Sequence, residues 1–219
     1  MTRALYALVG WIAIPFVVAR LAWRARKQRG YLERLGERFG RYGTIDAGPR
    51  IWIHAVSVGE TRAAAPLVAA LRERFPRHRI LLTHMTPTGR ATGAALFGGQ
   101  VEQAWLPYDL GFAVRRFLDR FRPAIGILLE TEIWPRLLEE SRRAGIPVVL
   151  ANARLSARSA ARYARAPSIT RWALANLAGI AAQTDEDAQR FVEIGARAPV
   201  VTGNVKFDMA VPGEMLERG

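Results

Sequence analysis

The sequence predicts an α/β protein with a Rossmann-like parallel sheet and helices on both faces, preceded by an N-terminal membrane-anchor helix. Two observations predict the sheet: short apolar runs alternate with helical segments from residue 50 onward, and these runs are almost continuously apolar. Such alternation is typical of a doubly wound sheet, and continuously apolar strands are expected where helices cover both faces. A third observation, a long uncharged run near the N-terminus, predicts the anchor.

The anchor is expected within residues 1–30. Residues 4–19 carry no charge, and a basic cluster follows directly. The run is at the lower length limit for crossing a bilayer and contains Pro15. Three interpretations therefore stay open: a helix that spans the membrane, a helix that lies in one leaflet, and a buried helix of a soluble domain. A small-x-small cleavage site does not follow the run, which disfavours a secretory signal peptide. The basic flank predicts that the rest of the chain is cytoplasmic.

Basic charge is concentrated in the same region. The 219 residues include 32 Lys and Arg against 19 Asp and Glu, a formal net charge of +13. The first 50 residues hold ten of the basic and three of the acidic residues, a balance of +7. Residues 31–49 are therefore expected to form an amphipathic membrane-proximal segment facing anionic lipid. Nucleic acid is not predicted as a partner, because the excess charge follows an apolar run and does not lie on a recognition element.

The remaining elements are expected in residues 50–208, which are predicted to form one domain. Apolar runs predict strands at 51–55, 79–84, 101–106, 124–130, 147–152, 179–183 and 199–203. Helices are expected over 61–74, after residue 89 and over about 134–144. Ligands on such sheets bind beyond the carboxyl ends of the strands, so the loops that follow the strands are where functional residues are expected.

The loop after the first strand carries Ser57, Gly59 and Glu60 at the start of a helix. The S-x-x-E spacing is that of a capping box, in which Ser57 caps the helix and Glu60 reaches back to the Ser57 amide. The functional interpretation is a backbone that a ligand can approach closely at Gly59, with Glu60 as a general base. The two interpretations are compatible, because a helix N-terminus holds a carboxylate in a defined orientation.

The loop after the second strand offers Thr86, Thr88 and Gly89 before a helix. Their hydroxyl and amide groups suit phosphate or sugar oxygens, or they act as ordinary caps. The fourth strand ends in Glu130 and Glu132. We interpret Glu130 as an acid or a hydrogen-bond anchor, because a carboxylate at the end of an apolar strand needs a partner. Glu132 is open to the alternative that it caps the next helix.

The last two strand ends complete the set of candidates. Asn152 and Arg154 follow the fifth strand and could face the same cleft, and Lys206 follows the last strand. The ammonium group of Lys206 could stabilise developing negative charge or a phosphate. The chain carries no cysteine, Walker A loop, G-x-G-x-x-G or H-E-x-x-H, so no metal site and no cofactor are predicted.

Seven short motifs occur in order along the chain: RLGERFG, WIHAVSVGE, TPTG, LPYD, ETEIWP, NARLS and GNVKFD. Together they closely resemble the N-terminal half of the bacterial 3-deoxy-D-manno-octulosonic acid (Kdo) transferases, membrane-associated glycosyltransferases that add Kdo to the lipid A precursor. The resemblance implies one half of a two-domain GT-B fold, in which the N-terminal half carries the anchor and binds the lipid acceptor. The C-terminal half of that fold binds the donor, CMP-Kdo.

The resemblance also implies roles for particular residues. It makes Glu60 the general base, and Glu130 and Lys206 groups that stabilise the transition state. We expect the acceptor to be bound by a set of residues from the same strand ends: Ser57, Gly59, Thr86, Thr88, Gly89, Glu132, Asn152 and Arg154. Two positions depart from the family's usual pattern, His84 where threonine is common and Arg136 where asparagine is common.

The function that this resemblance implies is transfer of Kdo from CMP-Kdo to the lipid A precursor (lipid IVA), with inversion, at the cytoplasmic face of the inner membrane. Residues 209–219 are expected to begin a linker to a C-terminal donor domain that lies outside this sequence. The chain alone is therefore expected to bind the acceptor without turnover. The alternative is a non-catalytic, membrane-anchored Rossmann-like module that binds lipid or a partner.

Overall fold

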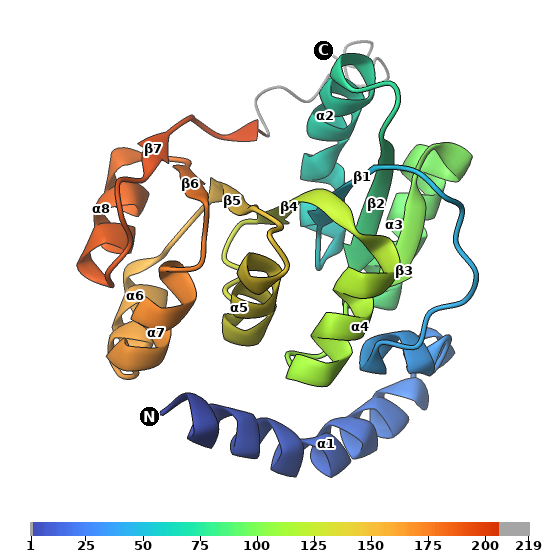
Figure 1. The fold of residues 1–219 in the computed structure, drawn as a ribbon, viewed down its shortest axis with the longest axis horizontal. Coiled ribbons are helices and arrows are strands. Elements are labelled where there is room, and N and C mark those ends of the chain that lie inside the picture. Colours follow the sequence, from blue (N-terminus) through green and yellow to red (C-terminus); the bar gives the residue numbers. More distant parts are fainter. Residues whose placement is uncertain (1, 206–219) are drawn as a thin grey trace, which may run out of the picture.

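The computed structural model describes residues 2–205, and within them the core is a seven-stranded parallel sheet (Figure 1). The strand order is β3-β2-β1-β4-β5-β6-β7, and every strand pair is parallel. The strands are β1 (Arg50–His54), β2 (Arg79–His84), β3 (Glu102–Trp105), β4 (Pro123–Leu129), β5 (Val148–Ala153), β6 (Gly179–Ala182) and β7 (Val200–Val201). The predicted Rossmann-like parallel sheet is confirmed, whereas Lys206 and residues 209–219 lie outside the described residues.

Helices cover both faces of the sheet, as predicted (Figure 1). On one face lie α2 (Val58–Arg74) and α3 (Pro87–Phe97), and the other face is covered by α4 (Gly111–Phe121), α5 (Pro135–Arg143), α6 (Ala157–Ala164) and α7 (Pro167–Leu174). Helix α8 (Asp185–Glu193) contributes Phe191 to the same apolar core as α4 to α7.

Alternate residues of each strand enter two separate apolar cores, because successive side chains of a strand point to opposite faces. In β1, Ile51 and Ile53 belong to the core beneath α2 and α3, whereas Trp52 belongs to the core beneath α4 to α7. Trp52 is fully buried, its ring centroid lies 5.0 Å from that of Phe117, and a Cβ at Gly126 would lie 2.6 Å from the Trp52 ring. Burial of such a side chain stabilises the fold by about 1.5–3 kcal/mol.

Residues 26–49 pack partly against the domain and contain two short 3₁₀ helices, η1 (Arg29–Tyr31) and η2 (Leu35–Phe39). Glu37 and Arg38 in η2 are buried. The backbone N–H of Trp105 donates to Glu37 Oε2 at 2.9 Å, and the Arg38 guanidinium lies 4.1 Å from the Trp105 ring. The membrane-proximal role predicted for residues 31–49 stays a prediction, and these two charged residues face the protein.

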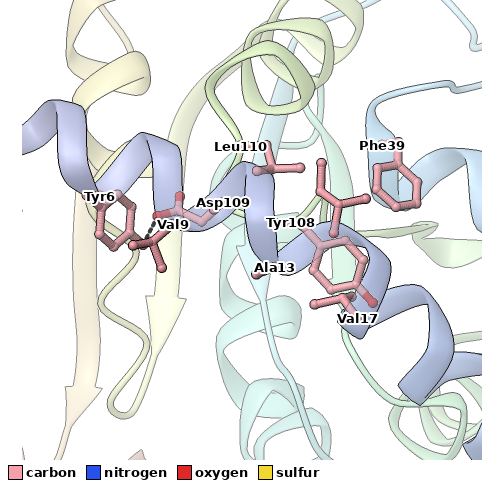
Figure 2. Close-up of a pocket in the computed structure, with 10 residues that line it drawn as sticks. Tyr6, Val9, Ala13, Val17, Phe39, Tyr108, Asp109 and Leu110 are labelled. Carbon is pink, nitrogen blue, oxygen red and sulfur yellow. Dashed lines mark hydrogen bonds between the residues drawn. The ribbon is translucent and has the colours of Figure 1, made fainter.

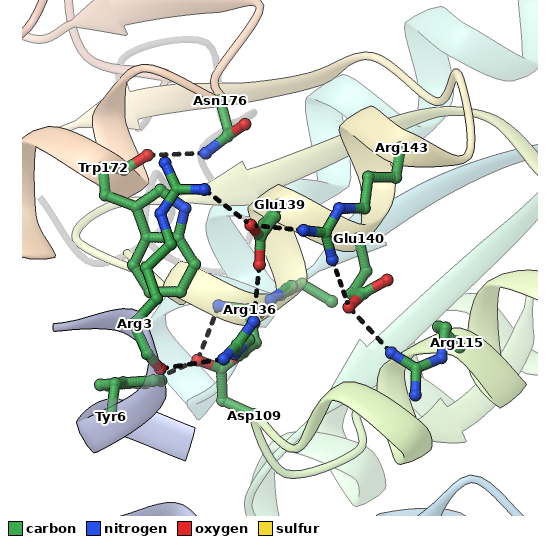
Figure 3. A network of polar contacts seen from close by, with 11 residues as sticks. Arg3, Tyr6, Asp109, Arg115, Arg136, Glu139, Glu140, Arg143, Trp172 and Asn176 are labelled. Atoms are coloured by element: carbon green, nitrogen blue, oxygen red, sulfur yellow. Dashed lines mark hydrogen bonds and ion pairs between the residues drawn. The ribbon is translucent and has the colours of Figure 1, made fainter.

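The N-terminal helix α1 (Arg3–Ala25) runs along the surface formed by α4, α5 and α7 as a further layer (Figure 1). Figure 3 shows the polar contacts near its first turns. The Tyr6 hydroxyl donates to Asp109 Oδ2 at 2.6 Å, and the Arg3 guanidinium pairs with Glu139 Oε1 at 3.3 Å. The Arg136 guanidinium donates to the carbonyl of Arg3 at 2.9 Å. These contacts attach the beginning of α1 to α5 and to the loop before α4.

The side of α1 that faces away from the domain is apolar and exposed. Of its 23 residues, Leu21 and Ala25 are the ones that become buried. Large apolar side chains are more than half exposed at Leu8, Ile12, Phe16 and Trp23, whereas the Trp11 ring, also more than half exposed, stacks on Phe112 of α4. The helix is long and apolar enough to cross a membrane by length and composition.

Candidate functional site

The candidate site lies at the carboxyl edge of the sheet, where the strand order reverses. Strand β1 pairs with β2 on one side and with β4 on the other, and the later strands continue outward from β4. This arrangement creates a topological switch point between β1 and β4, the place where open α/β sheets bind ligands. Glu60 lies in the first turn of α2, directly after the loop that follows β1, and Glu130 and Glu132 lie in the turn that follows β4.

Glu60 is buried and held by the loop that precedes α2. The backbone N–H of Val56 donates to Glu60 Oε2 at 2.8 Å, and the Ser57 hydroxyl donates to Glu60 Oε1 at 2.8 Å. Ser57 is also the N-cap of α2, because its oxygen accepts the N–H of Glu60. The predicted cap by Ser57 is therefore confirmed, and the Glu60 side chain reaches back to the amide of Val56. Burial raises the pKa of the Glu60 carboxyl, the bonds from Val56 and Ser57 lower it, and the nearby charge of Glu130 raises it further.

Glu132 lies close to the other two carboxylates and is also largely shielded from solvent. Burial raises the pKa of Glu132 to about 7; the hydrogen bond from Trp134 opposes the shift, and the charges of Glu60 and Glu130 add to it. The indole N–H of Trp134 donates to Glu132 Oε2 at 2.6 Å. The structure thus brings Glu60, Glu130 and Glu132 together, and places a group that titrates near neutral pH among them.

Glu130 adopts a left-handed backbone conformation, with φ of 59°. Such a conformation is uncommon for a residue other than glycine and is found preferentially at functional sites. Its backbone N–H donates to the carbonyl of Ala151 in β5, so the turn begins directly at the sheet edge.

The alternative interpretation of Glu132 as the cap of the following helix is wrong. Helix α5 begins at Pro135, and its first free amides belong to Arg136 and Leu137. Both donate to the carboxylate of Asp109, at 3.0 and 2.7 Å. Glu132 does not reach them because its side chain is held by the Trp134 ring. Asp109 lies in the LPYD motif. The sequence pattern does not predict that it caps α5, although aspartate is a common capping residue.

Thr86 and Gly89 hold α3 against the loop that carries Glu60. Thr86 is the N-cap of α3, accepts the N–H of Gly89 at 3.1 Å and donates to the carbonyl of Val56 at 2.8 Å. A Cβ on Gly89 would lie 2.9 Å from that carbonyl, so only glycine fits. In contrast, Thr88 and Gly59 are exposed at the same edge, and a Cβ on Gly59 would meet nothing closer than 4.0 Å.

Asn152 and Arg154 occupy different surroundings after β5. Asn152 is buried with φ of 50°, and its Oδ1 accepts the N–H of Val205 at 3.2 Å. Within residues 2–205, the Nδ2 atom of Asn152 has no hydrogen-bond partner. The side chain of Arg154 is exposed, and its carbonyl accepts the Thr131 hydroxyl at 3.0 Å. Asn152 therefore holds the backbone of Val205, the last residue that the structure describes, whereas the side chain of Arg154 is exposed to solvent.

The two positions that depart from the family's usual pattern have different surroundings. His84 is buried under α3, with Nδ1 2.9 Å from the carbonyl of Ala55, and burial lowers its pKa to about 4. Arg136 faces α1, as described above. Among the residues that the structure describes, no group of three or more His, Asp or Glu is arranged to hold a metal ion. The expectation that the chemistry uses no metal stays a prediction.

Comparison with known proteins identifies relatives along the whole chain. The family model described as 3-deoxy-D-manno-octulosonic-acid transferase (kdotransferase) matches residues 33–209. A 3-deoxy-D-manno-octulosonic acid transferase from Bordetella pertussis is 46% identical over 229 residues, covering 100% of this chain and 53% of the relative. The transferase of the same name from Haemophilus influenzae is 37% identical over 222 residues, covering 100% of this chain and 52% of the relative.

The fold has a counterpart among solved structures. The crystal structure of UDP-GlcNAc 2-epimerase from Neisseria meningitidis bound to UDP-GlcNAc matches with a TM-score of 0.51 and 14% identity, covering 73% of this chain and 48% of that one. At this identity the likeness concerns the fold alone. The chain spans about half the length of the curated relatives it matches. On the sequence matches, the chain belongs to the 3-deoxy-D-manno-octulosonic acid transferase family.

Proposed function

We propose that this chain is the acceptor-binding half of an enzyme that transfers Kdo from CMP-Kdo to a sugar hydroxyl of the lipid A precursor. The observation that carries the proposal is the meeting of Glu60, Glu130 and Glu132 at the switch point of the sheet, in a chain from the Kdo transferase family. CMP-Kdo would be held chiefly by the second half of the complete protein, across the same edge of the sheet.

Glu60 is the proposed general base, which takes the proton of the acceptor hydroxyl as that oxygen attacks the anomeric carbon with inversion. Each carboxylate oxygen of Glu60 accepts one hydrogen bond from the loop, which leaves a lone pair available for the acceptor. The bonds from Val56 and Ser57 fix the orientation of the carboxylate. Burial raises its pKa, which strengthens it as a base.

The other carboxylates take complementary roles in this proposal. Glu130 and Lys206 stabilise the transition state, with Lys206 balancing the charge of the departing CMP. Glu132, whose pKa of about 7 keeps it partly protonated, donates a hydrogen bond to an acceptor oxygen. Thr88, Gly59 and Arg154 are exposed at this edge and are the groups that contact the acceptor directly.

The two sides of α1 support a proposal for how the chain associates with a membrane. We propose that α1 lies in the plane of the cytoplasmic leaflet of the inner membrane and does not cross it. The contacts of Tyr6 with Asp109 and of Arg3 with Glu139 lie near the start of the helix, and Val17 lies beside Phe39 and Tyr108 further along it. A helix that crossed the membrane could not keep these contacts with a single domain. The opposite apolar side is free to enter the leaflet, and the basic residues after it favour anionic lipid.

The proposed base is tested by Glu60→Gln in a form of the protein that carries both halves. We expect the rate of Kdo transfer to the lipid A precursor to fall about 10²–10⁴-fold, the range that general-base assistance supplies. Glu73→Gln is the matched control, because Glu73 is an exposed residue of the same helix. A Glu60→Gln enzyme that transfers Kdo at the wild-type rate would remove Glu60 from this role.

The same preparation distinguishes the non-catalytic alternative. Binding of vesicles that contain the acceptor, combined with no transfer by the wild-type two-domain protein when CMP-Kdo is added, would favour a lipid-binding module over an enzyme. Transfer that depends on Glu60 favours the enzyme.

A further inference from the structure

Helix α1 leaves an elongated apolar groove between itself and the domain (Figure 2). The groove has a volume of about 220 Å³. One wall is the side of α1 that carries Val9, Ala13 and Val17, and the opposite wall is made by Phe39, Tyr108 and Leu110. Val9 is 49% exposed, so the groove opens toward the side of α1 that we propose to lie in the membrane.

The dimensions of the groove match a single hydrocarbon chain. At 1.5 Å per residue, the segment of α1 from Tyr6 to Val17 is about 16 Å long. Half of the hydrocarbon core of a bilayer is about 15 Å deep, which is the reach of one acyl chain. The volume of 220 Å³ lies below the roughly 300–1,000 Å³ of pockets that hold compact drug-sized ligands. The space is thus suited to a long and narrow apolar group.

The two ends of the groove differ in charge. At one end the Tyr6 hydroxyl is bonded to Asp109, whose carboxylate is already shared with α5. At the other end lies the Tyr108 hydroxyl, beside Val17 in Figure 2. Burial raises the pKa of this phenol, and the positive charges of three nearby arginines oppose the shift: Arg38, Arg20 and Arg24. At the Tyr6 end, Arg3 and Arg136 are already paired with Glu139, so a negatively charged headgroup is favoured at the Tyr108 end.

We propose that this groove binds one acyl chain of an anionic phospholipid of the bilayer, with the lipid phosphate against Arg20 and Arg24. Two features favour this occupant: the groove is lined mainly by apolar side chains of α1 and of the domain, and the charges of Arg20 and Arg24 act on Tyr108 at one of its ends. The inference rests on the proposed in-plane position of α1. A lipid held in this way fills the space between α1 and the domain and so fixes the orientation of the domain on the membrane.

The test uses phosphatidylglycerol that carries a photoreactive diazirine on one acyl chain, in vesicles with the 219-residue chain bound. After irradiation, mass spectrometry locates the labelled residues. We expect labels on Ala13 and Leu110, inside the groove. Labels confined to Ile12 and Phe16, on the outward side of α1, would overturn the proposal. Sedimentation of the protein with the vesicles is measured in parallel, so failure of membrane association is seen separately from failure of the lipid site.

Two sets of variants make the assignment specific. Ala13→Phe fills the groove and should abolish labelling of Leu110 while the protein still sediments with vesicles; Ala22→Phe, at an exposed position outside the groove, should leave it unchanged. Arg20→Gln and Arg24→Gln should each weaken labelling by the anionic lipid about fivefold. Retention of the Leu110 label in Ala13→Phe, or equal labelling by a phosphatidylcholine probe in the wild type, would contradict the proposal.

Discussion

The hydrogen bond between Tyr6 and Asp109 is expected to carry much of the energy that holds α1 on the domain. Asp109 accepts from the Tyr6 hydroxyl at 2.6 Å and from two amides of α5, those of Arg136 and Leu137. A hydrogen bond to a charged group contributes about 1.5–3 kcal/mol, and an N-cap contributes about 0.5–2 kcal/mol. Tyr6→Phe should therefore lower the free energy of unfolding by about 2 kcal/mol, and Asp109→Ala by about 3–4 kcal/mol.

The double variant separates the two contributions of Asp109. Once Asp109 is alanine, Tyr6 has lost its acceptor, so adding Tyr6→Phe should change the stability little. The coupling energy between the two positions is then expected to be about 2 kcal/mol. Urea unfolding followed by tryptophan fluorescence measures all four proteins. Tyr31→Phe is the control, because the Tyr31 hydroxyl accepts only a long 3.4 Å bond from Arg24.

Two results would refute this reasoning. Additive effects of Tyr6→Phe and Asp109→Ala, within about 0.5 kcal/mol, would mean that the bond does not hold α1. An equal loss of stability in Tyr31→Phe would mean that any tyrosine in this region has the same effect.

Three further changes have defined outcomes. The pKa of Glu132 is raised to about 7 in the folded protein, above its ordinary value of 4.5, so the stability that its proton provides is present below pH 4.5 and lost as the pH rises through 7. Glu132→Gln should thus gain about 2–3 kcal/mol relative to the wild type between pH 4.5 and pH 8.5, and an equal difference at both pH values in urea unfolding would contradict the shift. Gly89→Ala places a Cβ 2.9 Å from the Val56 carbonyl and should lower the free energy of unfolding by about 1–3 kcal/mol, whereas Gly99→Ala, with open space around it, should change it little. Phe16→Asp, at a side chain that is 71% exposed, should reduce vesicle binding at least about tenfold with an unchanged urea midpoint; unchanged sedimentation with vesicles would show that this side of α1 does not enter the membrane.

Most of the sheet could be predicted from the sequence because its strands are buried on both faces. A buried parallel strand is a continuous apolar run, and β2 occupies the predicted range of 79–84. The last strand is shorter than predicted, only Val200–Val201, because both residues are exposed at the sheet edge and have no second layer to pack against. Helix α2 begins three residues before its predicted start, since Ser57 and Glu60 close the first turn.

The candidate carboxylates could be predicted for a different reason. Parallel strands end at one edge, so any polar residue at a strand end is brought toward the others. Glu60, Glu130 and Glu132 lie close together because the strands that precede them end at this edge.

Two features could not be predicted because their partners are distant in the chain. The sequence around Glu37 and Arg38 predicts solvated charges in a basic segment. Their burial depends on Trp105, which lies more than sixty residues away in the chain.

The orientation of α1 also has no sequence signal. Its protein-facing and outward-facing sides are both apolar, so a periodic pattern does not separate them. Tyr6 is the polar residue within the apolar part of α1 that lies on the docked side. The sequence does not show this, because the hydroxyl of Tyr6 bonds to the distant residue Asp109.

The left-handed backbones of Glu130 and Asn152 have a consequence for attempts to stabilise this protein. Adjacent strands β4 and β5 each place a residue with a side chain where glycine would adopt the same conformation more easily, by about 1–2 kcal/mol. A design method that scores backbone compatibility would therefore select glycine at both positions. Such a protein would have less backbone strain, but it would have lost the bond of Asn152 to Val205 and two polar groups from the edge where the acceptor is proposed to bind. Thermal stability is thus a misleading guide to improvement at these two positions.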